Sequence, residues 1–551
     1  MRGSIMRFKR LMTGALALAA TGLLVTACSS KQKANSTGQV ASKQVLNWSY
    51  LAELATLDPS KVSDAYSGDI INNSMEGLYR LGKNSKIEPG LATQTEVSDD
   101  NLTYTFKLRK DGKWSNGDKV TAHDFVYGWR RTVDQKTASP YAYLYSGVKN
   151  ADAIIKGEAK PETLGITAKD EHTLVVTLEK PIPYFKLLLG FEPFLPQNQK
   201  AVEKFGDEYG TSAKTMVYNG PFVVEGWTGS NLNWKLNKNP NYWDKKKVKL
   251  ETINFKVNKS TTTSYNLYQS KQLDYTTLSN EQAKQLAKDP AYSALKQART
   301  TYLEFNQTKE SFKNLKIRQA LSYAVDRQEL AKNIVGGGSQ PSLGIVSQGL
   351  AQYKGQDFAQ AAKTTVGVSY DKKKAKELLK EGLAELGQDK LSFTLMSSDD
   401  DVSKKVAEFI QSQLEENLSD VKVSVQSVPL KTRIARGEKG DFDVQLSGWS
   451  ADFADPISFL DLFTKDNSYN FGKWENAEYD RLIEASKTTD ASDKAKRFAD
   501  LIQASKVLSE QQGVAPLYQT NVPQLTNVTV KGLIQNSAGA TNNWKEVYIV
   551  E

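Results

Sequence analysis

Cysteine and histidine are almost absent from this chain, and their scarcity argues against several kinds of site. The 551 residues include one cysteine, Cys28, and two histidines, His123 and His172. One cysteine cannot form an internal disulfide, and no cluster of His and Cys is available to hold a transition metal through nitrogen or sulfur. We therefore expect neither a metal site nor a cofactor.

Motifs of catalysis are missing as well. The chain has no Gly-x-Ser-x-Gly elbow, and its two histidines have no identifiable serine partner for a triad. A near match to a phosphate-binding loop ends in Asn84, where Ser or Thr would have to reach magnesium. Asp452 and Asp455 are compatible with a glycosidase acid/base pair, but the following Pro456 indicates a turn. We expect the chain not to be an enzyme.

Long apolar runs are also missing, apart from one at the N-terminus. Leu11 to Val25 carries no charge, follows a basic segment, and is shorter than the about 20 apolar residues that a membrane span needs. This pattern predicts a secretion signal over residues 1–27. The basic residues before the run are Arg2, Arg7, Lys9 and Arg10.

Cys28 directly follows Val-Thr-Ala, and this arrangement resembles a bacterial lipobox. The resemblance implies cleavage before Cys28 and a lipid on its sulfur; the alternative is a free thiol in a discarded signal peptide. Each buried methylene of a lipid contributes about 0.8 kcal/mol, so acyl chains would anchor the protein on the extracellular face of the cell membrane. Residues 28–44 read as the lipidated cysteine and a polar tether, with the folded part beginning near Val45.

The overall composition is that of a soluble globular protein. Hydrophobic residues make up 39% and charged residues 25%, and the length predicts two or three lobes. The aromatic content of 10% is high, and surplus Tyr and Trp often line binding clefts. The net charge of +9 falls to +5 without the four basic residues of the signal. Clusters such as Lys245–Lys247 are therefore expected to be solvated, not to bind nucleic acid.

Hydrophobic periodicity predicts several separate elements. We expect strands over Leu102–Leu108 and Leu174–Leu178 and a helix over Asp124–Arg131. Apolar residues at helical spacing between Leu315 and Val335 predict a helix that stops at the three glycines 336–338.

The stretch from Leu391 to Asp455 is the most informative. Its pattern is strand, helix, strand, helix, strand, which predicts a parallel sheet with right-handed crossovers. The expected elements are strands 391–396, 421–425 and 442–446, a helix over 402–418 and a short helix through Ile434. Ligands bind at the carboxyl ends of such strands. The residues there are Ser447, Gly448, Trp449, Ser450, Ala451 and Asp452.

Asp452 is the best candidate for a ligand contact in this segment. It follows a strand and lies near Trp449 and Phe453, and a carboxylate shielded by aromatic rings is a good partner for an ammonium group. A free strand edge could pair with the backbone of an extended peptide, with Asp452 at its α-amino end. The alternatives are a structural turn at Asp452 and a sugar stacked on Trp449.

Four segments resemble a known family. They are the run Leu102–Arg131 (LTYTFKLRKDGKWSNGDKVTAHDFVYGWRR), Leu57–Pro59 (LDP), Asn219–Phe222 (NGPF) and Asn314–Arg327 (NLKIRQALSYAVDR). The family is the peptide/nickel-binding family 5 of bacterial extracellular solute-binding proteins, and within it the chain is similar to the oligopeptide-binding proteins of ABC importers.

The resemblance implies an α/β fold of the periplasmic-binding-protein type II, cluster C. It has two main lobes and a small extra lobe, with the ligand enclosed between the main lobes. We expect lobe I over 45–65, 190–300 and 519–551, lobe II over 66–189, and lobe III over 301–518.

The resemblance also assigns ligand contacts. Asp452 would take the peptide's amino group, and the strand before it would pair with the peptide backbone. Glu53 and the backbone around Ala55 would lie on the facing side, and Asn470 matches a ligand-contacting asparagine. Leu446 stands where some relatives have an arginine for the peptide's carboxyl end, and Arg436 is a candidate replacement.

The function implied is that of a monomeric, Gram-positive-type lipoprotein that captures oligopeptides, nutritional or signalling, and delivers them to ABC permease subunits. The alternative is a non-peptide ligand on the same fold, such as an oligosaccharide, haem or a metal chelate. The scarcity of histidine argues against nickel, and Asp452 argues for peptide.

Overall fold

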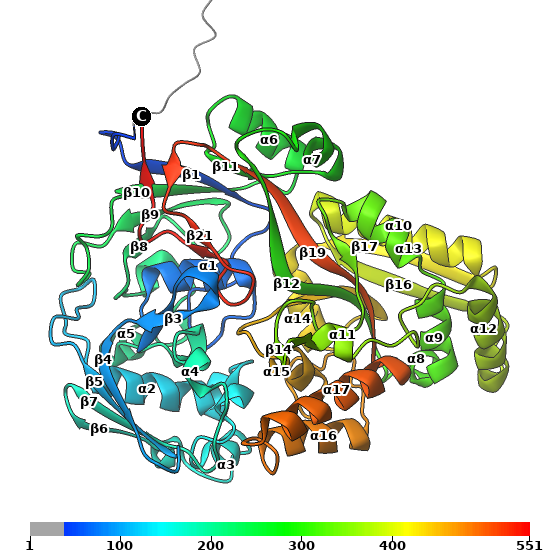
Figure 1. Cartoon of the computed structure of the whole chain (residues 1–551), viewed down its shortest axis with the longest axis horizontal. Coiled ribbons are helices and arrows are strands. Elements are labelled where there is room, and N and C mark those ends of the chain that lie inside the picture. The colour runs from blue at the N-terminus through cyan, green and yellow to red at the C-terminus, as the bar shows by residue number, and fades with distance from the viewer. Residues whose placement is uncertain (1–37) are drawn as a thin grey trace, which may run out of the picture.

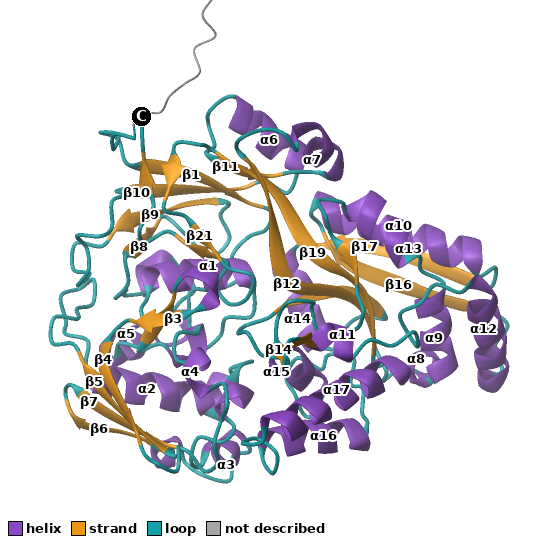
Figure 2. Ribbon diagram, in the orientation of Figure 1, coloured by secondary structure: helices purple, strands orange, loops and turns teal. Residues whose placement is uncertain are grey.

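The computed structural model describes residues 38–551, which form three main β-sheets with helices around them (Figures 1 and 2). The predicted signal segment, Cys28 and most of the predicted tether lie outside the described residues. The described chain starts beside its own C-terminus, where Val40 and Val550 form an antiparallel bridge. None of the helices within residues 38–551 has the length and apolar character that crossing a membrane requires.

The first sheet has the strand order β1-β10-β9-β8. Its strands are β1 (Val45–Tyr50), β10 (Thr252–Val257), β9 (Asn233–Lys238) and β8 (Phe222–Glu225). β1 pairs in parallel with β10, and the other pairs are antiparallel. Leu46 and Trp48 of β1 are fully buried, because alternate residues of a strand point to the same face. β1 is thus an edge strand that is anchored by one face.

The second sheet is small and antiparallel, with the order β4-β5-β7-β6. Its strands are β4 (Ala92–Val97), β5 (Thr103–Leu108), β7 (Thr173–Thr177) and β6 (Ile166–Asp170), and helix α2 (Ala122–Val133) packs against it. The strands and the helix expected around residues 102–108, 174–178 and 124–131 are confirmed. Thr121 and Asp124 form a capping box that fixes the start of α2.

The third sheet contains the predicted βαβαβ unit. Its order is β11-β19-β12-β18-β16-β17, with β13 beside β19, and β16 pairs in parallel with both β17 and β18. The strands are β11 (Tyr275–Thr277), β12 (Tyr292–Phe305), β13 (Gln340–Pro341), β16 (Leu391–Ser398), β17 (Val421–Val428), β18 (Val444–Ser450) and β19 (Val514–Thr526). The crossovers are α13 (Asp401–Asn417) and α14 (Leu430–Glu438).

Two sequence-based boundaries differ from the structure. The third strand, expected over 442–446, is β18 at 444–450, because β12 pairs with it residue for residue from Val444 to Ser450. The single helix expected from 315 to 335 is interrupted after Tyr323. There the side chain of Asp326 accepts hydrogen bonds from the backbone N–H groups of the next turn and starts a new helix.

The other helices surround these sheets. They are α1 (Ala65–Ser74), α3 (Ala151–Ile155), α4 (Phe185–Leu188), α5 (Gln199–Phe205), α6 (Thr261–Gln269), α7 (Asn280–Leu286), α8 (Glu310–Lys313), α9 (Leu315–Tyr323), α10 (Arg327–Glu329), α11 (Phe358–Ala361), α12 (Lys372–Leu386), α15 (Ile457–Leu460), α16 (Ala477–Lys487) and α17 (Lys494–Glu510). A π-helical turn, Leu330–Val335, follows α10.

Short two-stranded ribbons complete the described part. Their strands are β2 (Tyr79–Leu81), β3 (Ile87–Pro89), β14 (Gln352–Tyr353), β15 (Gln356–Asp357), β20 (Val530–Lys531), β21 (Ile534–Gln535), β22 (Asn542–Asn543) and β23 (Tyr548–Ile549).

Two long strands connect the halves of the molecule. In Figure 1, β12 and β19 run from the region of the first sheet, beside β11, into the βαβαβ unit. Their pairing shifts register between Lys296 and Thr300 and again between Thr301 and Tyr302. Such irregularities bend a strand pair. They lie next to the predicted boundary between residues 300 and 301, and the lobe boundaries themselves stay a prediction.

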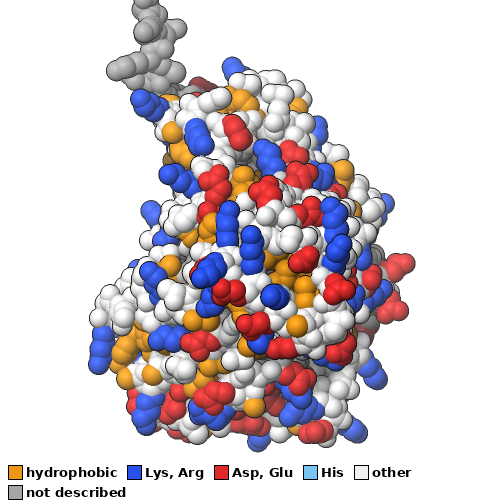
Figure 3. Space-filling model, turned by 90° about the vertical axis from the view of Figure 1, so that its right-hand side faces the viewer, with side chains coloured by type: hydrophobic (Ala, Val, Ile, Leu, Met, Phe, Trp, Pro, Cys, Tyr) orange, Lys and Arg blue, Asp and Glu red, His pale blue; other side chains and the backbone are white. Residues whose placement is uncertain are grey.

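Buried apolar side chains form two clusters. The larger extends from the first sheet through the second to the region of α15–α17, and the smaller lies among β16–β18 and helices α9, α12 and α13. On the face shown in Figure 3, Lys and Arg side chains alternate with Asp and Glu, with no broad area of one sign. Positive and negative side chains are therefore interspersed on this face, and the net charge of +5 forms no basic patch there.

A buried ion pair ties α2 to the loop after β1. Both guanidinium NH groups of Arg131 donate to Asp58, at 2.8 and 2.6 Å from its two carboxylate oxygens, and the Asp58 side chain is 1% exposed. Removing one partner of a buried pair leaves a charge uncompensated, which costs about 3–5 kcal/mol. We therefore expect Asp58→Asn to lower the free energy of unfolding by about 3 kcal/mol.

The measurement is urea unfolding of the soluble mature protein. The matched control is Asp111→Asn, since Asp111 also pairs with an arginine, Arg109, but its side chain is 64% exposed. Exposed pairs contribute about 0–1 kcal/mol, so the control should unfold almost like the wild type. Equal destabilisation by both variants would contradict a structural role for the buried pair.

Candidate ligand-binding cavity

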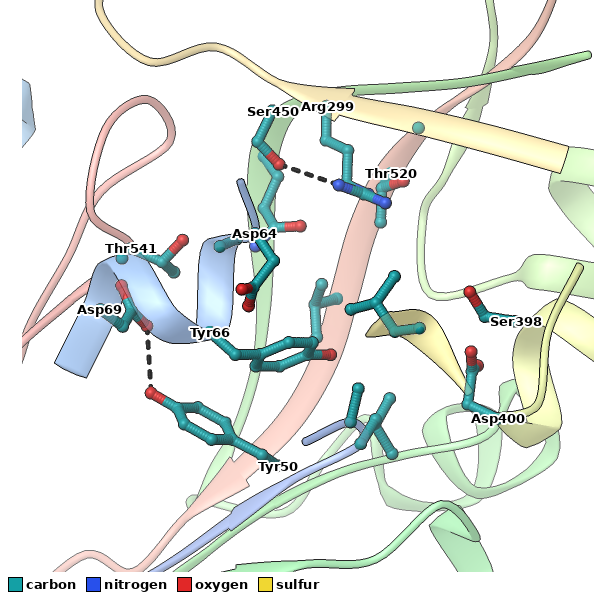
Figure 4. A pocket seen from close by; sticks show the side chains of 18 of the residues that line it. Tyr50, Asp64, Tyr66, Asp69, Arg299, Ser398, Asp400, Ser450, Thr520 and Thr541 are labelled. Atoms are coloured by element: carbon teal, nitrogen blue, oxygen red, sulfur yellow. Dashed lines mark hydrogen bonds between the residues drawn. The ribbon is translucent and has the colours of Figure 1, made fainter. Parts of the chain in front are cut away.

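A cavity of about 360 Å³ lies between the first and third sheets. One wall is built from the end of β1, the segment that follows it, and the start of α1. The other wall is built from β18, the middle of β12 and β19, and the starts of α13 and α14. Figure 4 shows side chains from these elements converging on the cavity. It is thus lined by residues far apart in the sequence.

The edge of β18 that faces β16 is mostly unpaired. Along its other edge, β18 pairs with β12 from Val444 to Ser450. β16 reaches only Val444 and Gln445, so within residues 38–551 the segment Leu446–Ser450 has no strand partner on this side. All five of these residues line the cavity. Their backbone N–H and C=O groups can therefore pair with an extended ligand.

The facing wall also ends in a strand edge. β1 pairs with β10 along one side only, and residues 48–52 line the cavity. At the start of β1 the other edge is occupied, because the backbone N–H of Asn47 donates to the Asp274 carboxylate and the Asp274 N–H donates to Asn47 O. In the described part of the chain no strand continues this contact along 48–52.

Asp452 lies at the end of the β18 edge and is partly buried. Its carboxylate accepts a hydrogen bond from the Tyr141 hydroxyl at 3.0 Å and from the Ser458 hydroxyl at 3.4 Å. Burial raises the pKa of Asp452 to about 8, although the two hydroxyl donors act in the opposite direction. Among residues 38–551 it forms no ion pair with a Lys, Arg or His. The carboxylate is therefore available to a cation from outside the chain.

Aromatic rings surround this carboxylate. The ring of Tyr469 lies 4.6 Å from that of Trp449 and 5.2 Å from that of Tyr141, measured between centroids. Phe453 stacks on Tyr184 at 5.1 Å. Tyr141 and Tyr184 come from the segment predicted as lobe II, so Asp452 is enclosed by residues from both sides of the molecule. The indole N–H of Trp449 is buried and has no hydrogen-bond partner.

The structure brings together one group of the predicted site residues. Ser447, Gly448, Trp449, Ser450, Ala451 and Asp452 all line the cavity. They do so as strand residues and the residues directly after the strand, because β18 is longer than the sequence pattern indicated. Their roles as ligand contacts stay predictions.

The other predicted site residues lie outside the cavity lining. Glu53 approaches Lys259, with 3.5 Å between its carboxylate and the Lys259 Nζ. The backbone N–H of Ala55 already donates to the Ser67 hydroxyl at 2.9 Å. Asn470 organises its own loop, since its amide bonds to the backbone O and N–H of Trp474. Arg436 is tied to Asp441 and Gln426 on the surface.

Sequence reasoning missed five carboxyl groups that line the cavity, and burial raises the pKa of three of them. Asp69 on α1 accepts hydrogen bonds from Asn542, and burial raises its pKa to about 7. Burial raises the pKa of Glu192 to about 8, and the nearby Asp452 adds to this shift. Burial also raises the pKa of Asp64, the N-cap of α1. Glu192 could have been noticed, because it is the one charged residue between Leu187 and Pro196.

Two arginines of the cavity were also missed. The Arg299 guanidinium donates to the Ser450 hydroxyl at 3.1 Å, as Figure 4 shows, and Arg433 bonds to Ser398, Gln445 and Ser447. Neither forms an ion pair with a carboxylate in residues 38–551. Nothing in their local sequence marks them, because each reaches the cavity through the sheet topology. Residues 38–551 contain no cluster of His, Cys, Asp and Glu able to hold a metal ion.

Comparison with known proteins identifies relatives over almost the whole chain. The dipeptide-binding protein of Lactococcus lactis is 39% identical over 549 residues, which is 97% of this chain and 98% of the relative. The structure of Listeria monocytogenes OppA bound to peptide is 37% identical and superimposes with a TM-score of 0.89, covering 93% of this chain and all of the other. The mixed α/β fold predicted for a type II periplasmic binding protein is thereby confirmed.

A third relative indicates the conformation. The structure of the murein tripeptide binding protein MppA of Escherichia coli, 32% identical, covers 93% of this chain with a TM-score of 0.85. The unliganded open form of MppA reaches only 0.62 over 94% of this chain. The chain described here is therefore not in that open arrangement, in agreement with the contact between Tyr141 and Asp452.

A family model gives the classification predicted from the sequence. The model described as bacterial extracellular solute-binding proteins, family 5 middle, matches residues 86–471. This match covers more than half of the chain. The dipeptide-binding relative aligns with the chain along nearly the whole length of both. The chain belongs to the bacterial extracellular solute-binding proteins of family 5.

Proposed function

We propose that this chain is the substrate-binding lipoprotein of an ABC importer and that it captures peptides for a membrane permease. The observation that carries the proposal is the carboxylate of Asp452. It lies partly buried in a closed cavity, at the end of an unpaired strand edge, and forms no ion pair within residues 38–551. A relative named for dipeptide binding and a similar structure with a bound peptide support a peptide as the ligand.

The strand edge and the carboxylate complement two features that free peptides share, the backbone and the α-ammonium group. Backbone N–H and C=O groups of the ligand pair with Leu446–Ser450 whatever its side chains are, which gives affinity without sequence selectivity. The ligand's α-ammonium group bonds to Asp452 and restores the ionised form that burial disfavours. The pairing fixes the register, because only one end of a peptide carries the ammonium group.

In this proposal the lobes close around the ligand before the protein delivers it to the permease. The ligand would bind between open lobes, and contacts such as that of Tyr141 with Asp452 would form as they close. Lipid on Cys28 would keep the protein at the outer face of the membrane, next to the importer. ATP hydrolysis on other chains would supply the energy, so the chain itself needs no catalytic group. Uptake of peptides as nutrients and uptake of peptides as signals both require this capture step.

The membrane anchor is tested by Cys28→Ser. We expect the variant to leave the membrane fraction and to accumulate in the medium, because the thiol that carries the lipid is gone. Ser29→Ala, one residue further on, is the matched control and should stay with the membrane. The measurement is immunoblotting of cell fractions. An unchanged distribution of the Cys28→Ser protein would contradict lipid anchoring at this residue.

The ammonium site is tested by Asp452→Asn. We expect the affinity for trialanine to fall by at least about 30-fold, since removing one partner of a buried charge pair costs about 2–5 kcal/mol. The measurement is isothermal titration calorimetry on protein stripped of ligand by unfolding and refolding. N-acetyl-trialanine should bind the wild type as weakly as free trialanine binds the variant. Asp111→Asn, a surface carboxylate, is the control. Equal binding of the free and acetylated peptides by the wild type would contradict the proposal.

The pH profile provides a second readout for the same pair of proteins. Asp452 has a pKa of about 8 without ligand, and a bound ammonium group lowers it, so binding releases a proton. The wild-type affinity should therefore fall as the pH is lowered from about 7.5 to 6, by up to about tenfold per unit. Glu192 titrates nearby with a pKa of about 8, so Asp452→Asn should reduce this slope and not abolish it.

A further inference from the structure

The carboxyl groups of the cavity point to selectivity for the first side chain of the ligand. We infer that Glu192 receives the positively charged side chain of a peptide that begins with lysine or arginine, next to the α-ammonium site at Asp452. The inference rests on the proposed function, which explains capture through the ligand's backbone and amino group alone. It adds the class of peptide that binds best.

Carboxyl groups outnumber basic groups along the cavity wall. The lining includes six acidic and two basic side chains, which are Asp64, Asp69, Glu192, Asp399, Asp400 and Asp452 against Arg299 and Arg433. Asp399 is neutralised by Lys259, with 2.7 Å between its carboxylate and the Nζ atom. Asp64 and Asp400 cap helices α1 and α13 through backbone N–H groups. The excess of acids favours a ligand that carries more positive than negative charge.

Glu192 is almost completely buried, and its contacts are neutral. It reaches the cavity from the short segment between α4 and α5 and is 3% exposed. The amide of Asn72 donates a hydrogen bond to its carboxylate, and its own backbone N–H lies close. Among residues 38–551 no Lys, Arg or His forms an ion pair with it. A buried carboxylate without a cation is costly, so a cation of the ligand would stabilise the ionised form.

Helix α1 holds one oxygen of this carboxylate. A Cβ atom at Gly68 would lie 2.8 Å from Glu192 Oε1, so only a glycine leaves room for the carboxylate at this position. Asn72, one turn further along α1, donates to the same oxygen. No other side chain of the described part of the chain donates to Oε2. That oxygen is therefore available to a ligand.

Three carboxyl groups lie near one another at this end of the cavity. Burial and the negative charges of Asp452 and Asp69 together raise the pKa of Glu192 to about 8. Asp69 is already engaged, because the backbone and side-chain N–H groups of Asn542 donate to its two oxygens at 3.1 and 2.6 Å, and the Tyr50 hydroxyl donates at 3.4 Å (Figure 4). With Asp452 assigned to the α-ammonium group, Glu192 is the carboxyl group left for a second cation.

Aromatic rings beside the two carboxyl groups suit the stem of a basic side chain. Phe191 and Tyr141 both line the cavity, and their rings meet edge to face with centroids 5.0 Å apart. Lys and Arg side chains pack their methylene groups on apolar surfaces, and their cationic ends are attracted to ring faces. A basic side chain therefore finds ring surface along its stem and the Glu192 carboxylate at its end.

The same end of the cavity contains an unused hydrogen-bond donor. Trp449 is 8% exposed, its ring lies 6.2 Å from that of Tyr141, and its indole N–H has no partner within residues 38–551. Buried polar groups of native proteins are normally paired. An unpaired donor beside carboxylates without cations is the pattern of a site that a ligand completes.

The closeness of Glu192 and Asp452 sets the position of the basic residue in the peptide. The α-ammonium group and the side chain of the first residue branch from one Cα atom, so both can reach neighbouring carboxylates. In an extended peptide the next side chain points to the opposite side of the backbone. We therefore expect the selectivity at the first residue and not at the second.

The test is isothermal titration calorimetry with two tripeptides, Lys-Ala-Ala and Nle-Ala-Ala, on mature protein stripped of ligand by unfolding and refolding. Norleucine keeps the four-carbon stem of lysine and lacks the ammonium group. We expect the wild type to bind Lys-Ala-Ala about 10- to 100-fold more tightly, the effect of a hydrogen bond to a buried charged group. In Glu192→Gln this preference should fall below about threefold, while the affinity for Nle-Ala-Ala changes little.

Two controls isolate the role of Glu192. In the protein, the matched variant is Glu203→Gln, since Glu203 also accepts a hydrogen bond from an amide, that of Gln199, but is exposed. It should keep the wild-type preference. In the ligand, Ala-Lys-Ala and Ala-Nle-Ala should bind the wild type about equally. Glu192→Asp keeps the charge on a shorter side chain, should retain part of the preference, and serves as a second variant if Glu192→Gln does not fold.

The outcomes distinguish this inference from the proposed function. Equal binding of Lys-Ala-Ala and Nle-Ala-Ala by the wild type, with Asp452→Asn still impairing both, would overturn the role of Glu192 and leave peptide capture intact. An undiminished preference in Glu192→Gln would also overturn it, as would an equal preference for lysine at the second position. Failure of every peptide to bind would overturn both proposals. A preference for lysine at the first position that requires Glu192 supports the inference.

Discussion

The properties of this cavity depend on charged side chains that form no ion pair within the described chain. The Asp452 carboxylate and the Arg299 and Arg433 guanidinium groups lie between the two halves of the molecule, where solvent stabilises them poorly, and none forms an ion pair with another described residue. Burying such groups is unfavourable unless something compensates them. Hydroxyl and amide partners compensate only in part, so closure around an empty cavity is costly. A ligand that brings compensating charge lowers that cost and favours the closed state.

The sheet topology delivers these groups to one place. β18 brings Asp452, β12 brings Arg299, and the crossover helix α14 brings Arg433. β12 and β19 continue into the region of the first sheet, and their register shifts lie close to the cavity. A bend in this strand pair would therefore move the two walls while leaving each sheet intact. The likeness to MppA, which is higher than to its open form, is consistent with a closed arrangement.

The sequence was most informative where local patterns control the structure. The alternation and helical periodicity of residues 391–446 are enough to predict the parallel unit, and they place Asp452 beside a strand end without any family resemblance. They failed at β18, whose last four residues are held by pairing with β12, an interaction that local hydrophobicity does not encode. Arg433 and Arg299 escaped notice for the same reason. Each is an ordinary charged residue until the sheet brings it to the cavity, and Arg436, three residues further along α14, points elsewhere.

The most direct test of this account is a crystal structure of the mature protein with trialanine. We expect the peptide to lie antiparallel to β18, with backbone hydrogen bonds to Leu446–Ser450 and its ammonium group at Asp452. A peptide bound elsewhere, or bound here with its amino end away from Asp452, would contradict the central claim.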